Sequence, residues 1–427
     1  METRLENLAP VRIVEPRVNI NNERKIGVLS GPREVTYFRD ISTSYSSSSV
    51  NHSITPPSNA IMDTRMLLYW QLQVSFTGPA GTGNLIQLGS NDGPRSYPLS
   101  QIITNTNLTI NGQSMSFSNY DLMSALAHYI GDKDMRKSLS GTATMLDQYQ
   151  SYSDWVALGS NKNPLAFYGE NAYEDPRGAL NISVVSNTST SAVLLINVIE
   201  PVFVSPLTWG SMVGPGLAGV QTLQLQMQLG DLTRVWSHAS SGNTISTISV
   251  VFSQAPELHY CMLSPNPDVD PYQLNRRYEY SYFNILSNSF NVGSLASGSS
   301  VSASSGTITV SSIPSRFYIF VRQQNSDRTY LTSDTFARID SISIVWDNRS
   351  GLLASASSEQ LHRMSVQNGL NQSWPQWNNY QGSVLCIQMG QDIGLKEDQA
   401  VGMMGQFQFQ CQITFKKLSA SSVNYQI

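Results

Sequence analysis

Alternation of apolar and polar residues is the dominant pattern of the chain. In LLYWQLQVSF (67–76) every second side chain is large and apolar, and glutamine, tyrosine or serine stands between them. LQLQMQL (223–229) and FQFQCQITF (407–415) repeat the arrangement. Successive side chains of a strand point to opposite faces, so the pattern predicts sheets with one buried and one polar face. It predicts strands at residues 66–76, 105–111, 180–186, 192–199, 220–230, 245–253, 278–286, 307–311, 316–322, 339–346, 383–389 and 406–416.

The regularly spaced glutamines indicate polar faces that are neutral and able to form hydrogen bonds. Glutamine is neutral and carries both hydrogen-bond donors and acceptors, so covering it does not incur the cost of desolvating a charge. A glutamine face can therefore lie in solvent or meet another polar protein surface. The sequence leaves both possibilities open.

Two short helices are predicted, and their setting suggests a duplicated architecture. Ser118 precedes NYDLMSALAHYI, with Asp121 at the position of a capping-box acid, and Ser357 precedes SEQLHRMSVQNG, which ends at Gly369. Each helix follows a strand that ends in an Asn/Gly turn. The unit of strand, turn and capped helix therefore occurs twice, which predicts two β-domains of similar build.

A proline-rich segment separates the two units. Residues 255–280 contain four prolines, which remove backbone donors and stiffen the chain, so a connector is predicted here. The aromatic segment 141–178 is expected to be an ordered loop, and the Ser/Gly-rich segment 293–306 a mobile or exposed loop tip. The resulting division is an N-terminal arm (1–35), a first sandwich (36–256), a connector (257–275) and a second sandwich (276–427).

Composition narrows the function. Hydrophobic residues make up 40% of the 427 residues and charged residues 13%, about half the usual share, so the surface is mainly uncharged and polar. Such a surface suits extensive protein–protein contact. The net charge of −4 argues against a dedicated nucleic-acid-binding protein. METRLENLAP lacks the apolar stretch of a secretory signal, and the longest apolar run, 192–204, is too short to span a bilayer, so we expect cytosolic synthesis without a membrane anchor.

Residues that could carry chemistry are scattered. Cys261, Cys386 and Cys411 form no close pair and no metal spacing, so buried or half-buried free thiols are expected. The five histidines show no second ligand at metal spacing. GPGLAG (214–219) precedes an alternating strand rather than a helix, which argues against a dinucleotide site. We expect no catalytic, cofactor-binding or metal-binding residues, and a protein that is not an enzyme.

Several segments resemble one family. PPSNAIMDTRMLLYWQLQVSF (56–76) resembles the opening strand of the first jelly roll in major capsid proteins of polinton-like viruses, virophages and adintoviruses. SIPSRFYIFVRQ (312–323) and ISIVWDNRSGLLASASSEQLHRMSVQNG (342–369) resemble segments of the second. The resemblance implies an all-β double jelly roll, that is, two tandem eight-stranded sandwiches with a few short helices.

The same resemblance implies a function and partners. It implies a structural protein of a DNA virus that forms homotrimeric, pseudo-hexameric capsomers tiling an icosahedral shell. The partners would be neighbouring capsomers and penton or minor capsid proteins, with no sequence-specific binding of nucleic acid. The protein would reside in the virion after synthesis in the host cytoplasm, and the N-terminal arm would lie at the capsomer base.

Aromatic residues in two loops are the candidate contacts between copies, because Trp and Tyr dominate interface energetics. These candidates are Tyr149, Tyr152, Trp155, Phe167, Tyr168, Tyr173, Trp374, Trp377 and Tyr380. They could instead anchor each loop to its own sandwich. A second interpretation of the whole chain is a tandem β-sandwich protein that binds or acts on carbohydrate, with Trp374 and Trp377 stacking on sugar rings.

Overall fold

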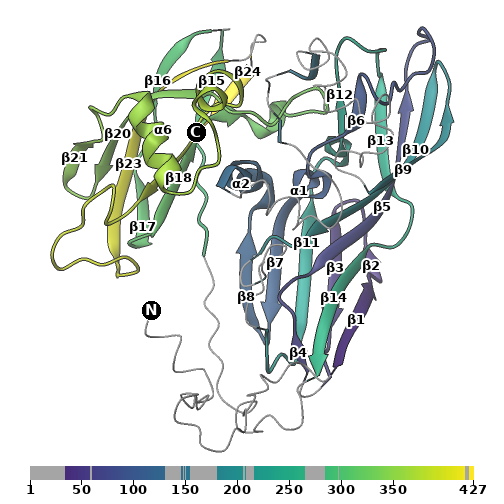
Figure 1. Cartoon of the computed structure of the whole chain (residues 1–427), viewed down its shortest axis with the longest axis horizontal. Coiled ribbons are helices and arrows are strands. Elements are labelled where there is room, and N and C mark those ends of the chain that lie inside the picture. The colour runs from purple at the N-terminus through teal and green to yellow at the C-terminus, as the bar shows by residue number, and fades with distance from the viewer. Residues whose placement is uncertain are drawn as a thin grey trace, which may run out of the picture.

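The computed structural model consists of two β-bodies, one from each half of the chain (Figure 1). It describes residues 34–57, 60–129, 146–147, 149, 151–153, 180–204, 207, 216–264, 284–296, 298–418 and 423–427. The N-terminal half, coloured purple to teal, forms the first body, and the C-terminal half, coloured green to yellow, forms the second.

The first body is a sandwich of two antiparallel sheets. One sheet has the order β1 (Glu34–Ile41), β14 (Glu257–Ser264), β5 (Leu67–Thr77), β10 (Ser191–Pro201) and β9 (Asn181–Asn187), with β13 (Thr247–Phe252) on β5 and β4 (Ile61–Met62) on β14. The other has the order β2 (Ser44–Tyr45), β3 (Ser49–Ile54), β11 (Leu223–Leu229), β7 (Ile103–Ile110) and β8 (Gln113–Phe117). Short elements complete the body, namely β6 (Asp92–Pro94) paired with β12 (Trp236–His238), α1 (Pro98–Ile102), α2 (Asn119–Leu126), η2 (Ala127–Tyr129) and η4 (Leu232–Val235).

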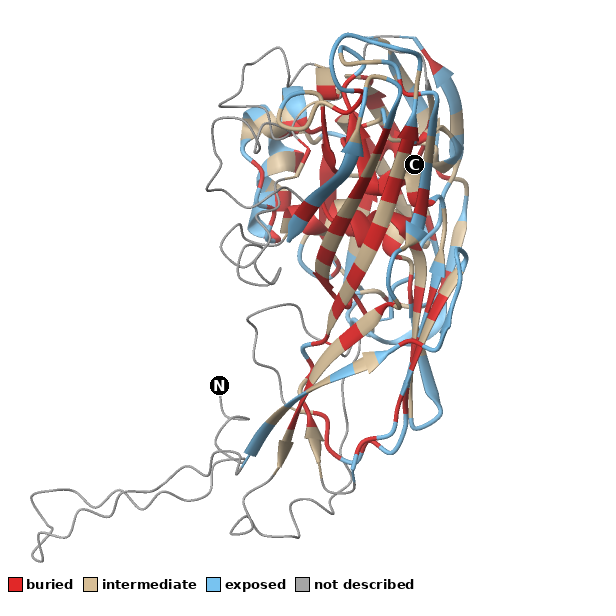
Figure 2. Ribbon diagram, turned by 90° about the vertical axis from the view of Figure 1, so that its right-hand side faces the viewer, coloured by how far each residue is buried: buried red, intermediate tan, exposed pale blue. Residues whose placement is uncertain are grey.

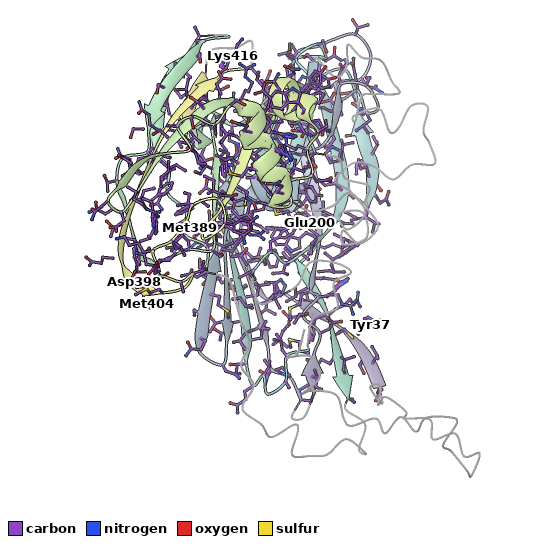
Figure 3. The ribbon with its side chains drawn as sticks, turned by 60° about the vertical axis from the view of Figure 1, so that its left-hand side comes forward. Tyr37, Glu200, Met389, Asp398, Met404 and Lys416 are labelled. Carbon is purple, nitrogen blue, oxygen red and sulfur yellow. The ribbon has the colours of Figure 1, made fainter. Side chains whose placement is uncertain are left out.

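The second body is built in a similar way. Its five-stranded sheet has the order β16 (Ser300–Ser304), β23 (Met404–Lys416), β20 (Arg338–Trp346) and β21 (Arg349–Leu352), with β17 (Ile308–Ser312) also on β23. Facing it are β15 (Asn291–Leu295), β24 (Val423–Gln426) and β19 (Arg322–Gln323), and the pair β18 (Arg316–Phe320) and β22 (Val384–Gln388). The remaining elements are η5 (Asn325–Asp327), α6 (Ser358–Gln367) and η6 (Gln376–Tyr380). Figure 3 shows Met404 and Lys416, the two ends of β23, far apart along this body.

Side-chain alternation produces a separate core in each body. Along β5, Trp70, Leu72 and Val74 are fully buried while the intervening side chains are half-buried, and the long strands in Figure 2 show the same alternation. Trp70 and Trp236 are among the largest fully buried side chains of the first core, and Trp346 and Trp377 among those of the second. The prediction of two β-domains with alternating strands is confirmed.

The predicted strands agree with the observed ones, with one exception. Residues 284–286 of the predicted strand 278–286 are not in a strand, and residues 278–283 lie outside the described part of the chain. All the other predicted segments overlap an observed strand. The three cysteines are buried and free, as predicted.

Two boundaries and one loop predicted from the sequence are wrong. Residues 257–264 were assigned to the connector, but they form β14, because the prolines at 256 and 265 flank this strand and do not interrupt it. Glu34 and Val35 were assigned to the arm, but they pair with Ser264 and Leu263. The segment 293–306 contains β15 and β16, which pair with β24 and β23, so the prediction of a loop tip is wrong.

The two predicted helices differ at their first turns. Before α6, Ser357 and Gln360 form a complete capping box, and Gly369 follows the helix with φ of 104°. Before α2, the Ser118 side chain makes no cap hydrogen bond to the backbone, and it contacts Asp121 at 3.1 Å. The capping role expected of Asp121 is wrong because this carboxylate binds the second body.

Candidate functional site at the junction between the two sandwiches

The two bodies meet at a buried carboxylate. Asp334, in the segment after η5, accepts hydrogen bonds from Arg328 Nη2 at 2.6 Å and Arg95 Nη1 at 2.9 Å, and Arg234 Nη2 lies 3.3 Å away. Arg95 follows β6 and Arg234 lies in η4, so both belong to the first body, whereas Arg328 and Asp334 belong to the second. The side chains of Arg95 and Arg234 are fully buried and that of Asp334 is 7% exposed.

The guanidinium groups determine the charge state of this cluster. Burial alone would raise the pKa of Asp334, but Arg95, Arg328 and Arg234 outweigh burial and hold it well below its usual range. Burial and repulsion from the other two arginines lower the pKa of Arg234 to about 9. Asp334 and Arg234 are therefore both charged at neutral pH.

A second ion pair ties α2 to the other body. Arg322 Nη2, on β19, donates to Asp121 Oδ1 at 2.6 Å, and Arg322 Nη1 donates to the Tyr120 carbonyl at 3.1 Å. The guanidinium groups of Arg234 and Arg328 both lie at cation–π distance from the Tyr120 ring, with their central carbons 4.6 and 5.0 Å from its centroid. Figure 1 shows α1 and α2 at the level where the two bodies approach each other.

Backbone groups and apolar side chains extend the junction. Arg95 Nη2 donates to the carbonyls of Thr329 and Thr332 at 2.8 and 2.7 Å. The Tyr129 hydroxyl donates to the Val384 carbonyl at 2.7 Å. Ala125, Phe336 and Val384 form a small apolar cluster contributed by both bodies. Buried ion pairs, hydrogen bonds to backbone carbonyls and packed apolar groups therefore connect the two sandwiches, while Arg95 Nε, Arg234 Nε and Arg234 Nη1 are buried without a hydrogen-bond partner in the described part of the chain.

Helix α1 contacts the arginines of the cluster through Gln101 and is itself held by Glu200. Glu200, at the end of β10, accepts hydrogen bonds from the amides of Leu99 and Ser100 at 2.8 and 3.0 Å and from the Ser100 hydroxyl at 2.8 Å. Burial raises the pKa of Glu200 to about 7. Gln101 of the same helix accepts from Arg234 at 2.9 Å and from Arg328 at 3.3 Å. Glu200, which Figure 3 places in the middle of the molecule, thus positions α1 against the arginines.

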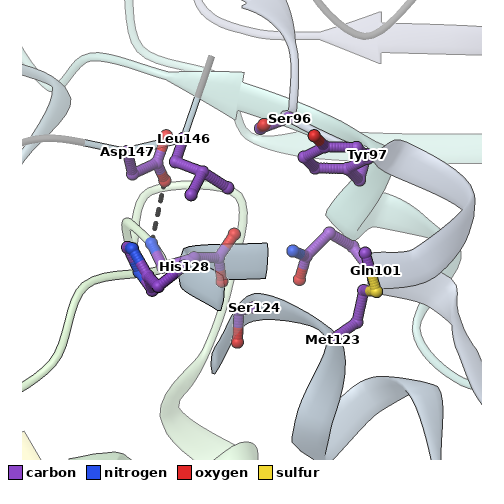
Figure 4. Close-up of a pocket in the computed structure, with 9 residues that line it drawn as sticks. Ser96, Tyr97, Gln101, Met123, Ser124, His128, Leu146 and Asp147 are labelled. Carbon is purple, nitrogen blue, oxygen red and sulfur yellow. Dashed lines mark hydrogen bonds between the residues drawn. The ribbon is translucent and has the colours of Figure 1, made fainter. Parts of the chain in front are cut away.

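A small pocket lies beside the cluster (Figure 4). Asp147 accepts from the Asp334 amide at 2.8 Å and from the Tyr152 hydroxyl at 3.0 Å. Burial lowers the pKa of His128 to about 4, so this lining residue is neutral at physiological pH. Across the described ranges, His, Cys, Asp and Glu nowhere gather in groups of three or more that could hold a metal ion. The two carboxylates that line the pocket, Asp147 and Asp334, both accept hydrogen bonds from residues at the junction.

Five of the nine candidate contact residues lie in the described part of the chain. Tyr149 and Tyr380, from the two aromatic loops, are brought together with their rings 5.3 Å apart, and Tyr380 is exposed. Tyr152 is buried beside Arg95. Trp377 is fully buried in the second core, and Trp374 is half-buried against the same core. The other four, Trp155, Phe167, Tyr168 and Tyr173, lie outside the described residues.

Sequence reasoning did not identify the junction residues. Arg95, Arg234 and the pair Arg328 and Asp334 lie in three separate parts of the chain and fit no spacing motif. Their chain neighbours are mostly polar, so no local pattern indicated that each of them would have a buried partner. The identity of that partner depends on how the two bodies dock.

Comparison with known proteins covers almost the whole chain. Residues 7–264 match the family model described as the Sputnik virophage major capsid protein first domain, and residues 282–381 and 379–427 match the major capsid protein V20 C-terminal domain. The putative capsid protein V20 of Sputnik virophage is 32% identical over 444 residues, which cover 95% of this chain and 73% of that protein.

Solved structures agree with this match. A chain of the Sputnik virophage structure determined by cryo-EM superposes with a TM-score of 0.83 at 31% identity, covering 98% of this chain and 89% of that one. The mavirus major capsid protein superposes with a TM-score of 0.68 at 14% identity, covering 98% and 91%, and shows the same fold. The double jelly roll implied by the sequence resemblance is confirmed. The comparisons give no support to the carbohydrate-binding alternative.

Proposed function

The chain belongs to the family of virophage major capsid proteins, and from this premise we propose that three copies associate into a pseudo-hexameric capsomer. As a member of a structural capsid protein family, the chain is a component of the virion shell. Each chain would supply two lobes of similar build, so a ring of three would present six lobes and pack like a hexagon. Capsomers of this shape would tile an icosahedral shell beside penton and minor capsid proteins.

The observation that supports this proposal best is the buried ion-pair junction. A ring of three closes with a near-hexagonal outline when the angle between the two sandwiches is the same in every copy. Asp334 and its three arginines are buried and joined to both bodies, so they hold that angle in each chain. Removing one member of such a cluster leaves buried charges unpaired, which typically costs about 3–5 kcal/mol.

Tyr149, Tyr380 and Trp374 are the described aromatic candidates that retain accessible surface. We propose that the surface around the Tyr149–Tyr380 pair contributes to contacts between copies. Tyr152 and Trp377 are covered by their own chain, so their part would be to hold the two loops in place. The N-terminal arm would extend to a neighbouring capsomer or to an inner protein.

Light scattering coupled to size exclusion tests the proposal. A homotrimer would have three times the chain mass of 47.1 kDa. A single species of one chain mass at micromolar concentration would contradict it.

Among the described helices, none combines the length and apolar character that a membrane crossing requires.

A further inference from the structure

The outer face of the β2–β3–β11–β7–β8 sheet carries only uncharged polar side chains at its centre. The strand register places Gln226 of β11 between Asn51 of β3 and Asn107 of β7. Gln224 and Gln228 stand on either side along β11, and all three glutamines are exposed. The side chains of this first amide face are those of Ser44, Ser49, Asn51, Ser53, Asn105, Asn107, Thr109, Ser114, Ser116, Gln224, Gln226 and Gln228.

The second sandwich repeats this surface. Gln412 of β23 stands between Ser304 of β16 and Ser343 of β20, and Gln408 and Gln410 continue the row. The side chains of this second amide face are those of Ser302, Ser304, Thr309, Ser341, Ser343, Val345, Gln408, Gln410, Gln412 and Thr414, and Lys416 and Arg338 border it at one end. Each sandwich therefore has a sheet whose outer face carries a glutamine strand at its centre. The flanking strands bear small hydroxyl and amide groups on the first face, and hydroxyl groups and Val345 on the second.

The glutamine side chains of the two faces can form more hydrogen bonds than they make within the described part of the chain. On the second face, Gln410 donates to the Ser304 hydroxyl at 3.0 Å and Gln412 to the Ser302 hydroxyl at 3.3 Å. On the first face, no hydrogen bond of the side chains of Gln224, Gln226 and Gln228 is found within the described part of the chain. An amide offers two donors and an acceptor with two lone pairs, so a row of amides can pair with a second row of the same chemistry.

We infer that the first amide face of one copy packs against the second amide face of another copy. This inference rests on the proposed trimer and names the surface that builds it. A solvent-facing sheet ordinarily carries charges that keep it soluble, and charges would have to be desolvated when covered. Two neutral faces of matching chemistry avoid that cost, and the partner that is certain to carry the matching face is another copy of this chain.

The size of the faces favours a closed ring. From strand spacing and rise, each face covers roughly 400 Å². One pair of faces would supply about half the area that each partner buries in a stable interface, roughly 800 Å². In a ring, every copy uses both faces and so buries roughly 800 Å² over two contacts, each of which alone is about half the size of a standard interface. Because the two faces differ, the contact is head-to-tail, and it closes when successive copies are related by a threefold rotation.

A lysine at the centre of one face tests the inference. Gln226→Lys places an unpaired charge in the contact, and the dissociation constant between copies is expected to rise on the order of a hundredfold. Gln367→Lys, at the exposed end of α6, is the matched control and should leave association unchanged. Association is measured by sedimentation velocity over a dilution series, with the melting temperature of each variant confirming that it is folded.

A charge pair across the two faces then tests which surfaces meet. Gln226→Lys combined with Gln412→Glu in one chain should recover association to within about tenfold of the unsubstituted protein, because the two charges attract across the contact. Gln226→Lys combined with Gln412→Lys should stay dissociated. Equal association by these two double variants would overturn the pairing of the first face with the second.

The outcomes separate this inference from the proposed function. Unsubstituted protein that remains a single chain at every concentration would contradict both. If the unsubstituted protein is a trimer and Gln226→Lys does not change its dissociation constant, the inference alone is overturned. The amide faces would then lie in solvent or contact a different protein.

Discussion

Substitution of Asp334 by asparagine tests the role of the junction. Asparagine has nearly the same shape but no charge, so Arg95, Arg234 and Arg328 would remain buried without their shared counter-ion. Removal of one partner from a buried ion-pair network costs about 3–5 kcal/mol. For the sandwich that unfolds first, this corresponds to a fall in melting temperature of roughly 6–20 °C.

Differential scanning calorimetry measures this change, and Asp340→Asn is its control. Asp340 pairs with Arg338 on the surface of β20, where the two side chains are 29% and 24% exposed, so its loss should cost about 0–1 kcal/mol. The folded pKa of Asp334 is lowered, so its stabilisation is present above its unfolded pKa and is lost as pH falls below that value. A melting temperature for Asp334→Asn equal to that of Asp340→Asn at pH 7 would refute the account of the junction.

Three further changes test other parts of the fold. The folded pKa of Glu200 is raised to about 7, so the free energy of unfolding should fall as pH rises from about 4.5 through 7. Glu200→Gln should flatten this part of the plot of unfolding free energy, measured by urea denaturation, against pH. An unchanged slope in the variant would contradict the assignment. Ser357→Ala removes a complete capping box and should cost about 1 kcal/mol in urea denaturation, whereas Ser118→Ala removes no cap hydrogen bond and should cost clearly less; equal losses would count against this reasoning. Gly382 has φ of 83°, and a Cβ there would clash with the Phe336 carbonyl oxygen. Gly382→Ala should therefore lower the melting temperature by several degrees, and a fall of less than about one degree would contradict this.

The strands of the sandwiches were predictable because their burial alternates. β5, β11 and β23 each bury every second side chain over most of their length, which the sequence shows directly. β14 was missed because its burial does not alternate strictly and prolines stand on both sides of it. β16 was missed because its serines and small apolar residues resemble a flexible loop until β23 is known to lie beside it.

The junction and the amide faces differ in how far the sequence could reveal them. The glutamine rows are local patterns, so the sequence indicated a neutral polar face, and the structure adds that Gln224, Gln226 and Gln228 are exposed. The Asp334 cluster is made of residues from three separate segments. Its geometry follows from the docking of two complete sandwiches, which no local pattern encodes. Asp121 illustrates the difference, because its local position indicated a cap and its tertiary contact made it a partner of Arg322.

Imaging of the purified protein tests the central claim most directly. The account holds that two sandwiches fixed at one angle by the Asp334 junction assemble as three copies around an axis. Class averages from negative-stain electron microscopy are predicted to show rings with six lobes arranged as three equivalent pairs. Two-lobed particles with the size of a single chain, seen at concentrations where the protein is folded, would contradict the account.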